Sequence, residues 1–198
     1  MFLKNERYLL VLTLLTCLFL SKNIHSDSNN TNNIIDYLNS LKFFSASFIQ
    51  NNGEDLSEGR VYIGEKRVRA EYISPTKILI ILDKDKAMYY NYELEEDEFF
   101  NPKNTNAWFF YDLFKNPYFL KDSLVKLKDN EIILEKAGVD SEQNNYLIKT
   151  FFENNPLILR KVEVLINDNF LQLSIFDHEY NKEFDNSFFK LINPKLLN

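Results

Sequence analysis

Apolar and polar residues alternate with a period of two along most of the chain after residue 43. Successive side chains of a β-strand point to opposite faces of a sheet, so this alternation predicts short strands joined by polar turns. The segments with this pattern are residues 44–50, 60–63, 67–73, 77–83, 87–94, 123–129, 131–136, 145–152, 157–168, 170–177 and 187–192. Such a succession of short strands and turns is typical of an antiparallel meander.

Two segments depart from this period. Before the first strand, Ile34, Ile35, Leu38 and Leu41 recur at spacings of one and three, which predicts a short amphipathic helix over residues 29–42. Residues 106–116 (NAWFFYDLFKN) concentrate aromatic side chains, include the only tryptophan, and are followed directly by a proline. We expect a second helix near residues 107–115.

Several strands are apolar on both faces, including residues 77–83, 87–94 and 157–166. A large antiparallel sheet curls or closes on itself. We therefore predict a mainly β domain, in which a strongly curved antiparallel sheet surrounds an interior and helices lie at its mouth. Such a sheet can enclose an apolar ligand. The pattern alone slightly favours the alternative, a barrel filled with its own side chains and without a ligand.

Residues 1–26 have the order of a secretory signal peptide: a charged start, an apolar run from Leu9 to Leu20, and a polar stretch. The apolar run is shorter than the about 20 residues that span a bilayer. We expect export to the periplasm with cleavage near Ser26, which leaves residues 27–198 as one domain. Cys17 follows Thr16, where a lipoprotein signal has Gly, Ala or Ser, so we expect an unmodified cysteine that is removed with the leader.

The chemistry left after the leader is limited. The remaining chain has no cysteine, and His178 is its only histidine, which excludes cysteine nucleophiles and sites built from several His or Cys ligands. A Ser-His-Asp triad would depend on His178, which we expect in a solvated turn. The net charge of -6 argues against a nucleic-acid partner, because phosphates attract clustered Lys and Arg. We therefore expect neither an enzyme, nor a metal site, nor a cofactor.

Charged residues elsewhere have ordinary structural explanations. The acidic run of Glu93 and residues 95–98 predicts a solvated loop. Asp83 and Asp85 fit a hairpin turn, without the further acidic ligands of a calcium loop. Arg67 and Arg69 alternate on one strand face, where they either meet solvent or contact a covering helix.

Four motifs, taken in order, resemble the LolA family of periplasmic lipoprotein carriers. Residues 44–50 (FSASFIQ) are similar to the family's F-x-A-x-F-x-Q strand. Residues 59–75 resemble its G-x-hydrophobic run and R-x-x-Y-x-x-P segment, and residues 80–91 its strand, turn and aromatic strand. Residues 189–194 (FKLINP) are similar to its closing motif. The resemblance spans nearly all of the chain after the leader.

The resemblance implies an unclosed half β-barrel with a helical lid, which holds the acyl chains of lipoproteins and carries them from the inner to the outer membrane. It implies acylated lipoproteins as cargo, an inner-membrane lipoprotein-releasing ABC transporter as donor, an outer-membrane acceptor, and a monomer. The residues expected to form the cavity and lid are Phe44, Phe48, Val61, Ile63, Val68, Ala70, Tyr72, Leu79, Ile81, Met88, Tyr90, Trp108, Phe109, Phe110, Leu113 and Phe114.

The chain departs from the family pattern at two turns. Lys84 stands where the family has Gly, and residues 64–66 replace a basic-Pro step that in some members holds the lid down. Three alternatives to a carrier remain: a membrane-anchored lipoprotein receptor with Cys17 lipidated, a periplasmic sensor module that binds a protein partner, and a barrel permanently plugged by residues 106–116.

Overall fold

The computed structural model describes residues 28–140, 142–185 and 187–197. The expected signal peptide and Cys17 lie outside the described residues. Export, cleavage and the state of Cys17 therefore stay predictions.

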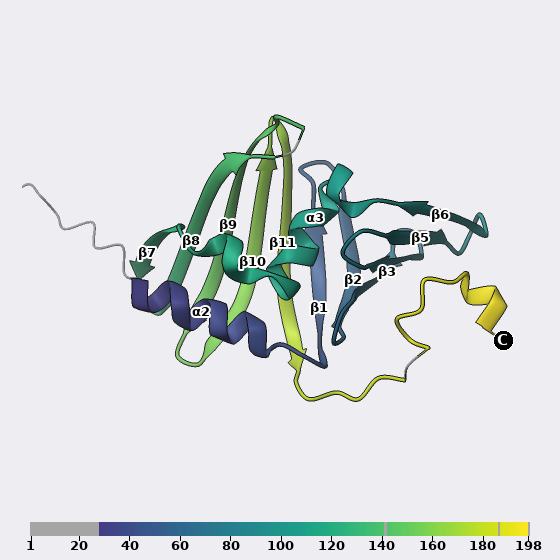
Figure 1. The fold of residues 1–198 in the computed structure, drawn as a ribbon, viewed down its shortest axis with the longest axis horizontal. Coiled ribbons are helices and arrows are strands. Elements are labelled where there is room, and N and C mark those ends of the chain that lie inside the picture. The colour runs from purple at the N-terminus through teal and green to yellow at the C-terminus, as the bar shows by residue number, and fades with distance from the viewer. Residues whose placement is uncertain (1–27, 141, 186, 198) are drawn as a thin grey trace, which may run out of the picture.

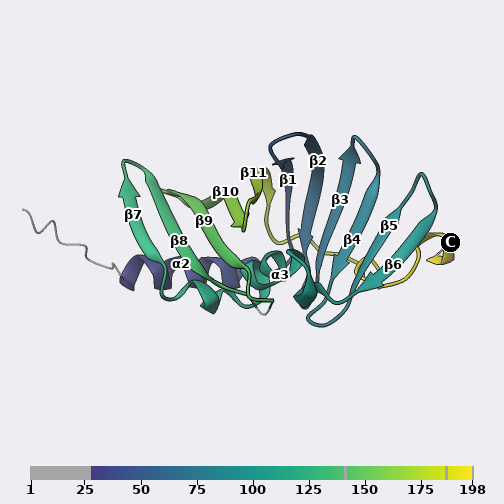
Figure 2. The same cartoon turned by 90° about the horizontal axis from the view of Figure 1, so that it is seen from above.

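Eleven antiparallel strands form one sheet (Figure 1). The strands are β1 (Phe44–Asn51), β2 (Leu56–Ile63), β3 (Val68–Ser74), β4 (Ile78–Leu82), β5 (Ala87–Asn91), β6 (Glu96–Phe100), β7 (Leu124–Lys128), β8 (Glu131–Val139), β9 (Asn145–Asn154), β10 (Leu157–Ile166) and β11 (Asn169–Glu179). Their spatial order is β6-β5-β4-β3-β2-β1-β11-β10-β9-β8-β7, so β1 and β11 join two meanders that are distant in sequence. The sheet ends at β6 and β7 and does not close. Its curvature is clear in Figure 2.

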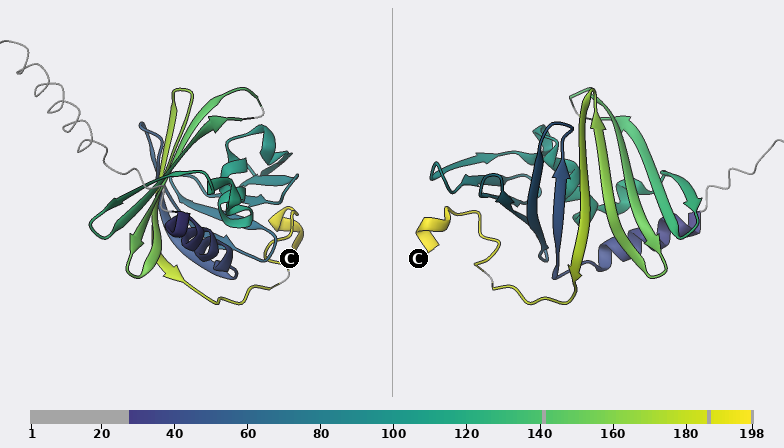
Figure 3. Two further views of the ribbon diagram at one scale, coloured as in Figure 1. Left: turned by 60° about the vertical axis from the view of Figure 1, so that its left-hand side comes forward. Right: turned by 180° about the vertical axis from the view of Figure 1, so that it is seen from behind.

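Two α-helices, α2 (Ser28–Ser40) and α3 (Ala107–Lys115), lie on one face of the sheet, which we call the inner face (Figure 3). Short 3-10 helices occur at η1 (Pro102–Asn104), η2 (Pro117–Leu120) and η3 (Pro194–Leu197). Helix α3 ends at Lys115 because Asn116 precedes a proline, which disfavours helical backbone, and Asn116 has φ -147°. This architecture confirms the predicted fold class and both predicted helices.

The two faces of the sheet have separate apolar clusters. Along β1, Phe44, Ala46 and Phe48 point to the inner face and join the main core, which also takes in the buried sides of α2 and α3. The opposite face, which we call the outer face, has a smaller cluster across β4 and β5. This outer-face cluster consists of Leu79, Ile81, Met88 and Tyr90.

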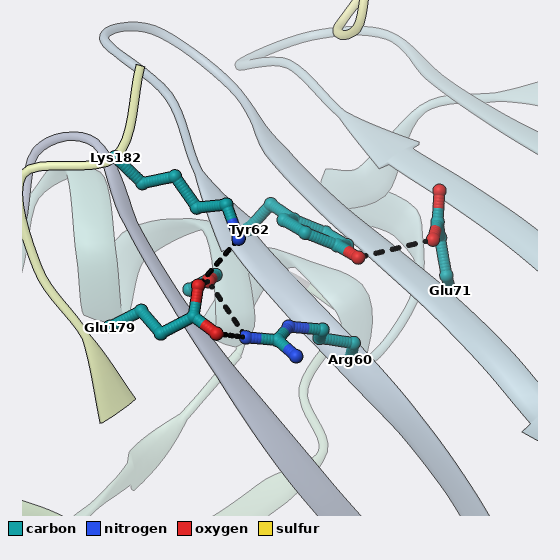
Figure 4. A network of polar contacts seen from close by, with 6 residues as sticks. Arg60, Tyr62, Glu71, Glu179 and Lys182 are labelled. Atoms are coloured by element: carbon teal, nitrogen blue, oxygen red, sulfur yellow. Dashed lines mark hydrogen bonds and ion pairs between the residues drawn. The ribbon is translucent and has the colours of Figure 1, made fainter. Parts of the chain in front are cut away.

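The C-terminal tail, residues 180–197, covers part of the outer face. It leaves the end of β11, passes β1 and β2, and finishes near β6 (Figures 1 and 2). Leu191 of the tail packs on the outer-face cluster. At the base of the tail, the Glu179 carboxylate pairs with Arg60 and Lys182 (Figure 4).

Besides the placement of His178, which is described with the site, two sequence predictions of local structure were wrong. Residues 96–98, expected in a solvated loop with Glu93 and Glu95, belong to the edge strand β6, where their acidic side chains are exposed. Residues 187–192, expected as a strand, form turns. Both sides of β11 are already paired, with β1 and β10, so the chain that follows finds no free edge there.

Candidate functional site

An apolar cavity of about 220 Å³ lies between the inner face and α3. Its walls come from β1 to β4, β10, β11 and α3. The lining residues are Phe48, Gln50, Val61, Val68, Ala70, Tyr72, Ile80, Leu82, Asn106, Ala107, Phe110, Leu113, Phe114, Val162, Leu171, Leu173 and Ile175.

No ionised side chain lines this cavity among the described residues. The Tyr72 hydroxyl donates to Gln50 Oε1 at 2.8 Å, which satisfies two of the few polar groups in the wall. Burial raises the pKa of Tyr72 to about 12, so the phenol stays neutral at physiological pH. The lining therefore offers mainly dispersion and hydrophobic contact.

A polar cleft of about 500 Å³ adjoins the cavity. Asn106, Phe110 and Leu171 line both spaces, while Glu54 and Asp168 belong to the cleft alone. Phe110 therefore stands at the boundary between an apolar interior and a solvated mouth.

The structure brings eight of the sixteen residues expected at the site to the cavity wall. They are Phe48, Val61, Val68, Ala70, Tyr72, Phe110, Leu113 and Phe114. Phe44 and Ile63 belong to the same inner-face core, but lie outside the lining.

Leu79, Ile81, Met88 and Tyr90, which were expected in the cavity, form the outer-face cluster instead. The register explains this: Val68 pairs with Leu82 and Ala70 with Ile80, so Ile80 and Leu82 share the inner face. Strand β4 is apolar at every position, so its sequence does not indicate which alternate set points inward.

The aromatic residues of α3 divide between cavity and core. Phe110, Leu113 and Phe114 face the cavity, whereas Phe109 is completely buried in the main core. Trp108 also lies outside the lining, with its ring centre 5.6 Å from Tyr146 and 6.1 Å from Phe119. Its buried Nε1 has no hydrogen-bond partner among the described residues.

Helix α3 is tied to the turn between β2 and β3, residues 64–67. The Lys115 ammonium donates to the carbonyl oxygens of Gly64 and Glu65. The Tyr111 hydroxyl donates to the carbonyl oxygen of Lys66 at 3.3 Å. Burial lowers the pKa of Lys115 to about 8, because removing a charge from water is unfavourable. These contacts hold down the helix that closes the cavity.

Arg67 and Arg69 contact the C-terminal tail, so neither alternative considered for them, solvent or a covering helix, describes their main partner. Arg67 pairs with Asp83 at 2.7 Å and donates to the Phe189 carbonyl oxygen at 2.8 Å. Arg69 donates to the Phe188 carbonyl oxygen at 2.6 Å.

His178 lies within β11 rather than in a solvated turn. Its Nε2 is 2.8 Å from the carbonyl oxygen of Leu159, and its ring packs near Phe44 and Tyr180. Burial lowers the pKa of His178, which favours the neutral ring.

The described residues include no group of three or more His, Cys, Asp and Glu that could hold a metal ion. No helix in the described part of the chain is long and apolar enough to cross a membrane.

Residues from β4, β10 and β11 complete the wall and were not expected from the sequence. They are Ile80, Leu82, Val162, Leu171, Leu173 and Ile175. Within each strand, alternation places these residues on one face of the sheet. The sequence does not show that the two meanders surround one cavity, because that depends on the pairing of β1 with β11.

Comparisons with known proteins bear on the fold alone. No family model matches the chain, and no curated protein matches it. A solved structure of MucB is similar in fold, with a TM-score of 0.53 and 9% identity, over 83% of this chain and 62% of that one. Two structures of MucB with MucA, one from Pseudomonas aeruginosa, have TM-scores of 0.47 and 0.49 at 9% identity, over 82–83% of this chain and 59–61% of theirs. The chain thus spans less than two thirds of each of these structures.

These matches overturn the assignment to the LolA family. The solved MucB structure with a TM-score of 0.53 belongs to a different family with a similar fold, and no family model matches the chain. Three of the four motifs behind that assignment lie in β1 to β5 and the turns between them, and the fourth lies in the C-terminal tail.

Proposed function

We propose that this chain is an exported, non-enzymatic binding module that takes one acyl chain in its inner cavity and signals occupancy to a protein partner through α3. The observation that carries the proposal is the uncharged apolar cavity beneath a helix held by a few polar contacts. Burying an acyl chain contributes about 0.8 kcal/mol per CH₂, which is ample for a dry pocket to hold one.

The size of the cavity favours a sensor over a cargo carrier. Its volume of about 220 Å³ is below the roughly 300–1,000 Å³ of sites that enclose drug-sized ligands. One acyl chain would fill it and press on α3, whereas the several chains of a lipoprotein would require the helix to leave the sheet. An occupant that displaces α3 changes the surface that a partner meets, as a sensor requires.

The polar mouth supports the same ligand class. An acyl chain that enters past Phe110 would leave its head group in the cleft beside the amides of Asn106 and Asn169. The expected signal peptide supports a periplasmic location, and the fold similarity to MucB supports a module of the partner-binding kind.

Titration with palmitate tests this function. Trp108 of α3 packs against Phe119 and Tyr146, so displacement of the helix should change its emission in a saturable way. Phe110→Glu should abolish the response, since a buried charge opposes an apolar ligand. Tyr118→Glu is the matched control: Tyr118 is 64% exposed just beyond α3, and this variant should respond like the wild type.

An emission spectrum indifferent to palmitate, in a protein that circular dichroism reports as folded, would sink the proposal and leave α3 as a permanent plug. A lipoprotein carrier is the second candidate, supported by the same apolar lining. A carrier should bind a triacylated lipopeptide tightly and stoichiometrically. A sensor that takes one acyl chain should instead bind palmitate at least as tightly as the lipopeptide.

A further inference from the structure

The C-terminal tail is held on the outer face mainly by side chains. Phe188 stacks edge-on against Tyr62, with 4.9 Å between ring centres, and lies under the Arg69 guanidinium at 4.2 Å. Leu191 packs on the outer-face cluster, and Asn193 donates to Asp97 at 2.7 Å. Together these contacts cross the strands from β2 to β6.

The outer face contacts the backbone of the tail as well as its aromatic rings. Arg67 and Arg69 donate to the carbonyl oxygens of Phe189 and Phe188, two consecutive residues. Residues 187–189 form a turn, which presents both carbonyl oxygens to the arginines, so this pair recognises the turn, whereas Tyr62 and the outer-face cluster recognise aromatic and apolar side chains.

The tail is attached in a way that permits exchange. Among the described residues, its only backbone-to-backbone hydrogen bond to the rest of the chain is from Lys182 N to Phe43 O, at 2.6 Å. Phe184, Phe188 and Phe189 remain partly exposed. A segment without a strand ladder can leave without breaking the sheet.

We infer that the outer face of β2–β5 is a second binding surface, and that the chain's own tail occupies it at rest. The surface fits a turn-forming segment of a partner protein with two consecutive aromatic residues and an apolar residue two positions later. The inference rests on the proposed function in one respect: it names the partner surface through which cavity occupancy would be communicated.

The turn of residues 64–67 connects this surface with the cavity. A Cβ at Gly64 would lie 2.7 Å from the Phe189 ring, so the tail presses directly on this turn from outside. The carbonyl oxygen of the same Gly64 accepts from Lys115 of α3. Arg67, at the other end of the turn, holds the Phe189 carbonyl oxygen. Tail and helix thus share one four-residue support, and release of either alters the support of the other.

Peptide binding tests the surface without any cavity ligand. The protein is residues 27–198, which contain every described residue, and the probe is a fluorescent peptide with the sequence of residues 181–197. The tethered tail competes at a high effective concentration, so the wild type should bind the probe weakly. Phe188→Ala combined with Phe189→Ala weakens the competitor and should increase probe affinity at least tenfold. Phe176→Ala, an exposed aromatic on the outer side of β11, is the matched control and should leave affinity unchanged.

Adding Arg69→Ala to the double variant should reduce probe affinity at least tenfold. Equal affinity in the wild type and the double variant, or indifference to Arg69, overturns the second surface. If the double variant and the wild type form dimers in size-exclusion chromatography, the surface binds the tail of a second copy, and the proposal of a different partner protein is wrong. If the double variant is unfolded by circular dichroism, Phe189→Leu replaces it with the same expected direction.

Hydrogen exchange tests the connection to the cavity. The amides of residues 107–115 should exchange faster in the double variant than in the Phe176→Ala control, and the probe peptide should restore their protection. Unchanged exchange refutes the coupling even if the peptide binds. Neither peptide binding nor hydrogen exchange uses palmitate, so both results remain valid if the protein does not bind an acyl chain.

Discussion

The two faces of β3–β5 are made by alternate residues of the same strands, yet they are covered in different ways. On the inner face, Val68 and Ile80 lie below a helix and leave a cavity of about 220 Å³. On the outer face, Leu79 and Met88 lie below an irregular tail and are almost completely buried. A helix is a stiff cylinder about 10 Å across, which bridges a concave wall without following it. An irregular chain follows the surface, so it fills the space that a helix leaves.

Because of this difference, the inner face has room for a ligand, whereas the outer face has the groups that recognise one. The helix-covered face has space and little polarity, which suits a flexible apolar ligand. The tail-covered face has guanidinium groups, rings and a filled apolar cluster, which suit a peptide. Both coverings depend on the turn of residues 64–67.

The largest expected effect is a loss of stability that distinguishes the core residue Phe109 from the cavity residue Phe110, both in α3. Phe109→Ala removes a completely buried ring and should lower the free energy of unfolding by about 3–5 kcal/mol. Phe110→Ala should cost clearly less, because part of that ring already faces empty space. Urea denaturation of both variants measures the difference. Equal losses would mean that no cavity exists beneath α3.

On the outer face, Met88→Ala should lower the free energy of unfolding by about 2–3 kcal/mol, because the tail can settle onto the shortened side chain. If the tail covers this cluster, combining the change with Leu191→Ala should be non-additive by about 0.5 kcal/mol or more. A double-mutant cycle by urea denaturation decides. If the two losses of unfolding free energy are strictly additive, Leu191 of the tail does not pack on Met88.

A smaller effect concerns the pH dependence of the helix contact. The folded pKa of Lys115, about 8, is below its ordinary value of 10.5 because of burial. Between these values the unfolded chain binds the additional proton, so stability due to this group rises as pH increases from about 8. Lys115→Met should flatten the rise between pH 8 and 9.5 in urea denaturation curves. Parallel curves for the two proteins would contradict a buried ammonium.

The smallest effect is at the base of the tail. Hydrogen bonds from Lys182 and Arg60 lower the pKa of Glu179 from 4.5 to about 2. The stability that this carboxylate provides is therefore present above about pH 4.5 and is lost as pH falls toward 2. Glu179→Gln should remove only that part of the acid sensitivity in thermal unfolding, and Glu183→Gln is an exposed control on the tail. Identical acid profiles for wild type and Glu179→Gln would refute the contact.

The sequence was sufficient for the elements whose patterns are unambiguous. Helix α2 has one apolar face, α3 ends at a proline, and β1 alternates cleanly, so each could be located from its own residues. Strand β6 could not, because it has acidic residues in three of its five positions and forms only through pairing with β5.

The candidate site was only half predictable for a related reason. Strands β4 and β5 are apolar on both faces, so alternation defines two sets of residues without saying which set faces inward. The choice depends on the partner register, and Leu79 and Met88 were assigned to the wrong face. Closure of the cavity by Leu173 and Ile175 depends on the pairing of β1 with β11, a contact between distant parts of the sequence.

The open sheet leaves β6 and β7 as strands with one unpaired side, and such edges are templates on which further chains can stack. Glu96, Asp97 and Glu98 keep their charges in solvent along β6, so two copies that approached through this edge would bring like charges together. Repulsion between exposed charges weakens with ionic strength, because the screening length falls to about 3 Å in 1 M salt. The acidic strand thus opposes association through this edge in dilute buffer, and concentrated salt weakens that opposition.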